Sequence, residues 1–124
     1  MKKSAGHTSH WFSSPLKYDN PGCNACHEDI TDLMLRLQDD TYEQARDVED
    51  LLLYTLEGIE QANADASVPA EQLDLAKSLF MRALTWWEWT AVSENSMGVH
   101  NWAEASDQLD KAEELATEAR SLLP

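Results

Sequence analysis

The stretch that decides the fold is residues 28–63, EDITDLMLRLQDDTYEQARDVEDLLLYTLEGIEQAN. Its apolar residues recur at steps of three and four, which is the period of one face of an α-helix, and most of its acidic residues fall on the opposite side. Gly58 lies near the end of this pattern and weakens a helix by about 1 kcal/mol relative to alanine, so we expect the last turns to fray. The stretch predicts one long amphipathic helix. The apolar positions are Ile30, Leu33, Met34, Leu37, Tyr42, Ala45, Val48, Leu52, Leu56 and Ile59.

Two further helices follow, separated by the breaks NADASVPAEQ (residues 63–72) and ENSMGVHN (residues 94–101). Pro69 suits the first turn of a second helix over residues 69–94, because the missing N–H is not needed there. Gly98 can take a backbone angle in the second break that other residues resist. The predicted apolar stripe of this second helix is Leu73, Ala76, Phe80, Ala83, Trp87 and Thr90.

The third predicted helix covers residues 101–122. Asn101 is a favourable N-cap residue, and Glu104 three positions later completes a pair that resembles a capping box. Helices joined by short loops pack antiparallel. The predicted buried stripe of this helix is Ala105, Leu109, Ala112, Leu115, Ala116 and Ala119.

Residues 1–27 have a different character. They contain Pro15, Pro21 and Gly22, show little periodicity, and contain no segment with a strand pattern. The predicted fold is therefore all-α: an extended arm over residues 1–27 that carries the cysteine motif described below, followed by a domain of three antiparallel helices over residues 28–124, the first of them long.

The charge of the chain limits its partners. The net charge is −14, and residues 18–124 contain all 23 acidic residues. A nucleic-acid partner is not expected, because binding the phosphate backbone requires a basic face. No apolar run approaches the length of a membrane span, and the start, MKKSAGHTSH, shows no secretory signal.

The motif that carries chemistry is Cys23-x-x-Cys26-His27. In this spacing two thiols bond to the vinyl groups on one edge of a haem, and the adjacent imidazole lies under the iron as its proximal ligand. We therefore expect one covalently attached haem c per chain. Three other interpretations are weaker: a zinc site lacks its second pair of ligands, a thioredoxin-like pair lacks its preceding strand, and a disulfide across two residues is strained.

A haem that transfers electrons usually has a second axial ligand, and His7, His10, Met97 and His100 are the candidates. His7 is most simply a solvated histidine of the arm, and Met97 beside the turn glycine is most simply packing. His10 and His100 are the stronger candidates. His100 directly precedes a helix N-cap in a short turn, which an ordinary core role explains poorly.

The tryptophans of WWEWT (residues 86–90) are predicted to divide between two faces of the second helix. Trp86 and Trp89 are three positions apart and share a face, while Trp87 is turned away. Such a stripe is more often core or interface than the wall of a cofactor site, and an oligomer contact fits it.

These motifs together resemble one family. HWFSSPLKYDNPGCNACH (residues 10–27), followed by a long helix and then ENSMGVHN (residues 94–101), is similar to the C-terminal part of the ammonia-forming cytochrome c nitrite reductases, which are pentahaem periplasmic enzymes. The resemblance covers nearly the whole chain from His10 onward. It implies that this segment carries the last haem motif and the long helices of a homodimer interface.

The resemblance also implies roles for individual residues. Cys23 and Cys26 match the attachment cysteines of the last haem, and His27 matches its proximal ligand. His10 and His100 match histidines that cross to ligate other haems. The sequence has no counterpart of three other features of that family: the distal ligand of the last haem, the catalytic haem with its lysine ligand, and the residues that bind nitrite.

The function expected from these observations is an electron-transfer module of a multihaem assembly, with a low-spin iron held by two histidines and ligands shared between chains. On its own the chain is not expected to be an enzyme. Its partners would be another haem-bearing chain or further copies of itself, in the periplasm or outside the cell. Two alternatives stay open: a scaffold subunit that docks a multihaem partner, and a five-coordinate haem enzyme acting on nitrite, peroxide or a diatomic gas.

Overall fold

The computed structural model describes residues 3–4, 7–8, 26, 30–93 and 96–124. The chain divides into two compact units, Met1–Leu33 and Met34–Pro124. In the first unit, strand β1 (Lys3–Ser4) pairs antiparallel with β2 (His7–Thr8). The sequence did not predict this ladder, because a two-residue strand is too short to show a period.

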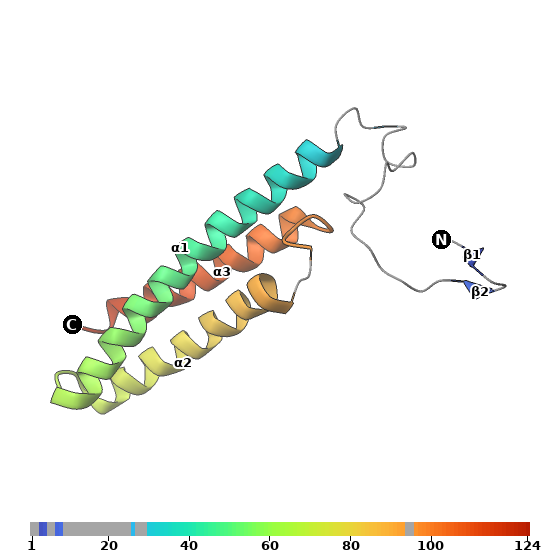
Figure 1. Cartoon of the computed structure of the whole chain (residues 1–124). Helices are drawn as coiled ribbons and strands as arrows, with labels where there is room; N and C mark the ends of the chain where they lie inside the picture. The colour runs from blue at the N-terminus through green and yellow to red at the C-terminus, as the bar shows by residue number, and fades with distance from the viewer. Residues whose placement is uncertain (1–2, 5–6, 9–25, 27–29, 94–95) are drawn as a thin grey trace. The chain divides into compact units, whose positions relative to one another are not determined.

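The second unit is a helical bundle. Helices α1 (Ile30–Asp65), α2 (Ala70–Glu88) and α3 (Trp102–Ser121) lie alongside one another from Met34 onward, and α2 continues into a short π-helix, η2 (Trp89–Ser93) (Figure 1). The predicted all-α fold with three helices, the first of them long, is confirmed. None of the helices in the described ranges is long and apolar enough to cross a membrane.

Consecutive helices run antiparallel, as predicted. Lys77 Nζ donates to Asn63 Oδ1 near the loop that joins α1 to α2, and Trp87 Nε1 donates to the Ala45 carbonyl further back along α1. Residues further along α2 therefore contact residues closer to the N-terminus of α1. The order of contacts is the reverse of the order in the chain, which defines an antiparallel pair.

α1 and α3 run parallel to each other. Gln44 Nε2 donates to Asp110 Oδ1 at 2.6 Å, and further along α1 the Thr55 hydroxyl lies 3.5 Å from the Ala116 carbonyl oxygen. The three helices thus alternate in direction along the chain, an up-down-up arrangement. This brings Gln38 and Thr41 of α1 beside the turn that precedes α3.

The core consists mainly of small and medium-sized aliphatic residues. Alanines at the contact positions allow helix backbones to approach closely while still excluding water. Every residue of the stripe predicted for α3 is buried. The central cluster contains Ala45, Val48, Leu52, Leu79, Ala83, Leu109, Ala112, Leu115, Ala116 and Ala119.

The burial predicted for the α1 stripe is wrong at two positions. Tyr42 and Leu56 are 55% and 37% exposed, whereas the neighbouring Thr41 and Thr55 are 2% and 0% exposed. Each threonine hydroxyl donates at 2.8 Å to the carbonyl four residues earlier in the same helix. Because this bond satisfies the hydroxyl, a threonine can occupy a buried position that hydropathy alone assigns to an apolar neighbour.

The N-terminus of α2 differs in detail from the expectation. Pro69 is itself the N-cap rather than a residue of the first turn, with ψ at 144°. Its carbonyl accepts the first helical hydrogen bond, from the Leu73 N–H at 3.0 Å. The extended backbone angle of Pro69 therefore ends the loop, and the helix begins with Ala70.

Gly58 allows a close contact between helices. A Cβ at this position would lie 3.0 Å from Arg120 Nη1 and 3.2 Å from Leu123 Cδ1, which is tighter than most real contacts. The Arg120 guanidinium carbon lies 4.1 Å from the centroid of the Tyr54 ring, and Nη2 donates to the Tyr54 hydroxyl. Gly58 thus lies where α1 meets the end of the chain, and α1 continues to Asp65.

Candidate haem site

Cys26 is the member of the Cys23-x-x-Cys26-His27 motif that the structure describes. It lies in a turn shortly before α1, it is exposed, and its thiol is free. Cys23 and His27 lie outside the described residues, as does His10. A thioether bond forms when a free thiol adds to a vinyl group of the porphyrin. The exposed thiol of Cys26 therefore fits attachment of haem c.

His100 lies in the turn between η2 and α3 and is exposed. The turn is closed by Ser96, whose hydroxyl oxygen accepts a hydrogen bond from the His100 N–H at 3.0 Å. The Ser96 carbonyl also lies 3.4 Å from the Val99 N–H. The turn therefore presents His100 at the surface with its backbone held by Ser96.

The same turn is seated on α1. Gln38 Nε2 donates to the Ser96 carbonyl at 3.1 Å. Met97 and Gly98 both have positive φ angles, +50° and +80°. Gly98 is buried, and a Cβ there would overlap the Thr41 hydroxyl, so the position accepts glycine alone without rearrangement.

The residue after His100 fixes the start of α3. Asn101 Oδ1 accepts from the Glu104 N–H at 3.4 Å, while Asn101 Nδ2 donates to Glu104 Oε2 at 2.7 Å. The first bond is the N-cap interaction that the sequence predicts. The second differs from a capping box, because the Glu104 carboxylate accepts from the side chain of Asn101 and not from its backbone N–H. His100 is the residue directly before this N-cap.

The tryptophans divide as their spacing predicts. Trp87 packs against the core and donates its indole N–H to the Ala45 carbonyl at 2.8 Å. Trp86 and Trp89 are 41% and 60% exposed. Trp89 begins the π-helical turn η2, and such turns often occur at functional sites.

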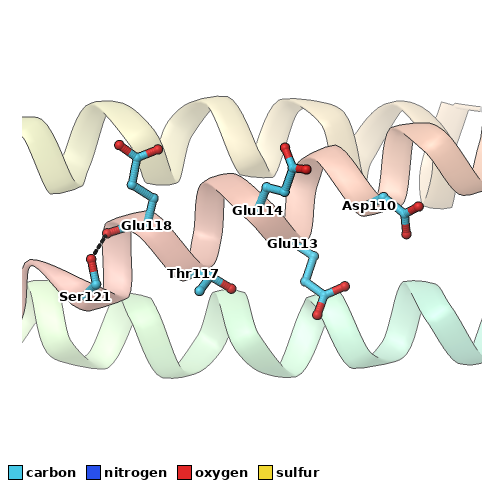
Figure 2. Close-up of a pocket in the computed structure, with 6 residues that line it drawn as sticks. All are labelled: Asp110, Glu113, Glu114, Thr117, Glu118 and Ser121. Atoms are coloured by element: carbon cyan, nitrogen blue, oxygen red, sulfur yellow. Dashed lines mark hydrogen bonds between the residues drawn. The ribbon is translucent and has the colours of Figure 1, made fainter.

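A surface hollow beside α3 lies apart from this turn. Figure 2 shows its lining residues along α3 from Asp110 to Ser121, whereas His100 precedes the N-terminus of the helix. The lining residues are Asp110, Glu113, Glu114, Thr117, Glu118 and Ser121. Four carboxylates make the hollow unfavourable for an anion such as nitrite. Within the described ranges, no group of three or more His, Cys, Asp or Glu side chains is placed to hold a metal ion.

The sequence indicates His100 as a candidate ligand, but it does not indicate the residues that hold the turn around it. Gln38 and Ser96 are 58 positions apart, and no local pattern signals their hydrogen bond. The glycine at position 98 gave a partial signal, because glycine in a turn indicates a positive φ angle or a close contact. The identity of the contacting residue, Thr41, depends on how the helices pack.

Comparison with known proteins gives two matches. The model of the cytochrome c552 family matches residues 1–124, which is the whole chain. The chain is also 26% identical over 125 residues to the cytochrome c nitrite reductase subunit NrfA of Nitratidesulfovibrio vulgaris (strain Hildenborough), an alignment that covers 93% of this chain and 24% of the relative. The chain thus spans about a quarter of the length of that curated relative. No solved structure is significantly similar to it.

Proposed function

Since the chain belongs to the cytochrome c552 family, whose members bind haem c, we propose that it is an electron-transfer module of a multihaem assembly of the nitrite-reductase type. The observation that carries the proposal is His100, an exposed histidine on a turn that hydrogen bonds and a buried glycine hold against α1. An exposed imidazole on a fixed turn is suited to ligating an iron that lies outside this bundle.

One haem c is attached to each chain in this proposal. Cys23 and Cys26 form the two thioether bonds, and His27 is the proximal ligand. The exposed, free thiol of Cys26 supports this assignment. Residues 1–27 act as the arm that carries the attachment site, and residues 28–124 act as the helical domain.

His100 and His10 are proposed to complete the coordination of haem irons carried elsewhere in the assembly. When bound, haem supplies one-electron redox chemistry, and two histidine ligands per iron leave no open position for substrate. The chain on its own is therefore not a nitrite reductase in this proposal. Its own residues hold, orient and shield the cofactor.

Exposed apolar residues on the bundle support an assembly of several chains. They lie on the outer side of α2 and η2 and are 41% to 67% exposed. The set is Leu75, Met81, Trp86, Trp89 and Val92. Aromatic and aliphatic side chains of this size dominate the energetics of protein interfaces. We propose that a second copy or another haem-bearing chain covers this face, in the periplasm, where haem is attached to such motifs.

The proposal is tested with the His100→Ala variant in the assembled, haem-loaded protein. Absorbance and electron paramagnetic resonance spectra should show one low-spin bis-histidine iron converted to a high-spin species. His7→Ala is the matched control, because we assign no ligand role to that histidine, and its spectra should equal those of the wild type. If His100→Ala leaves every haem spectrum and midpoint potential unchanged, His100 is not an iron ligand.

A further inference from the structure

The turn that carries His100 has a backbone conformation that needs support. Met97 has a φ angle of +50°, in the left-handed region that residues other than glycine rarely adopt, and Gly98 follows at +80°. Conformations of this kind persist only where surrounding contacts determine them. The residues that supply those contacts therefore control where His100 lies.

Contacts from α1 to the described residues of the turn contribute to this support. The first is the hydrogen bond from Gln38 Nε2 to the Ser96 carbonyl, at 3.1 Å. The second is the close packing of Gly98 against Thr41, which is 2% exposed and donates its hydroxyl to a carbonyl of α1. Ser96 in turn accepts the His100 N–H through its hydroxyl oxygen, at 3.0 Å. A chain of contacts thus leads from α1 through Ser96 to the backbone of His100.

We propose that Gln38 is a positioning residue for His100 as an iron ligand. This inference rests on the proposed ligand role of His100. An axial imidazole must hold its nitrogen within a few tenths of an ångström of the bonding position, and a small displacement of the turn moves the ring away from it. Gln38 fixes the turn by donating to the Ser96 carbonyl, so the strength of the iron–His100 bond depends on a residue that does not touch the iron.

Gln44 provides a matched control on the same helix. It is also a half-buried glutamine, and its Nε2 also bonds across to another part of the bundle, namely Asp110 Oδ1 at 2.6 Å. That bond ties α1 to α3 and does not reach the turn. Gln44→Ala therefore removes a comparable interaction without loosening the support of His100.

The experiment measures how readily added cyanide displaces His100 in the assembled, haem-loaded protein. Cyanide binds only after His100 dissociates, so its apparent Kd falls in proportion to the loss of His100 ligation. Gln38 acts on His100 through Ser96, and losing one such hydrogen bond changes an equilibrium about three- to tenfold. Gln38→Ala should lower the apparent Kd for cyanide by that factor, while Gln44→Ala should leave it within about twofold of the wild type. Gln38→Glu keeps the length of the side chain but removes the donor, and it should behave like Gln38→Ala.

Three outcomes distinguish the positioning role of Gln38 from the ligand role of His100 on which it rests. Increased cyanide binding in both Gln38 variants, with helix content retained by circular dichroism, supports the inference. If both variants behave like Gln44→Ala while His100→Ala yields a high-spin haem, the ligand role stands and the positioning role is wrong. If His100→Ala changes no haem spectrum, the ligand role and the positioning role are both wrong.

Discussion

Leu52 and Leu53 are adjacent in the sequence and carry the same side chain, but they lie on different faces of α1. Leu52 is 5% exposed and belongs to the central cluster, whereas Leu53 is 54% exposed. Replacing each by alanine removes the same atoms from the same helix. The difference between the two variants therefore measures what burial in the bundle contributes.

The expected magnitudes differ several-fold. A buried leucine replaced by alanine costs about 2–5 kcal/mol, because the transfer free energy is lost and a cavity remains. An exposed leucine replaced by alanine changes the free energy of unfolding by about 0.5 kcal/mol or less. With roughly 4–8 °C of melting temperature per kcal/mol for a domain of this size, Leu52→Ala should melt at least about 6 °C below Leu53→Ala.

The assay is denaturation of the purified chain followed by far-ultraviolet circular dichroism, with urea midpoints beside the thermal ones. Leu52→Asp extends the series, since a carboxylate at this buried position should cost several kcal/mol and unfold most of the protein. Equal melting temperatures for Leu52→Ala and Leu53→Ala would refute the packing of α1 against the other two helices.

Three further variants test single features of the bundle by the same measurement. Gly98→Ala forces a side chain into the left-handed region and against α1, and it should lower the free energy of unfolding by about 2 kcal/mol or more; an unchanged value would mean that the turn is not seated on α1. Trp87→Phe removes the indole bond to the Ala45 carbonyl and should cost about 1 kcal/mol, a loss that Trp86→Phe should not share. Asn101→Ala removes the N-cap of α3 and should also cost about 1 kcal/mol, so a neutral effect would show that the cap is not needed.

The sequence predicts the helices well because each one repeats a strong local signal. The six positions predicted to be buried on α3 are all buried, since alanine and leucine at helical spacing leave no competing arrangement. The cap at Asn101 is also predicted correctly, because both partners lie within one turn. These features depend on residues that are close together in the chain.

Other features depend on packing between segments and are not visible in the sequence. The burial of Thr55 in place of Leu56 depends on which side of α1 meets α3, and hydropathy favours the leucine. The π-helical turn at Trp89–Ser93 leaves no mark in the spacing of apolar residues. The bond from Gln38 to Ser96 joins positions 58 residues apart. His100 could be identified as a candidate ligand, but the residues that support it could not.

The most direct test of the account is the mass of the intact chain after denaturation, for protein produced in a host that attaches haem to c-type cytochromes. Covalent attachment of haem predicts the mass of the 14.0 kDa chain plus one haem, and a Cys23→Ser, Cys26→Ser double variant should lose that addition. A wild-type chain of unmodified mass, with both thiols open to alkylation, would contradict it.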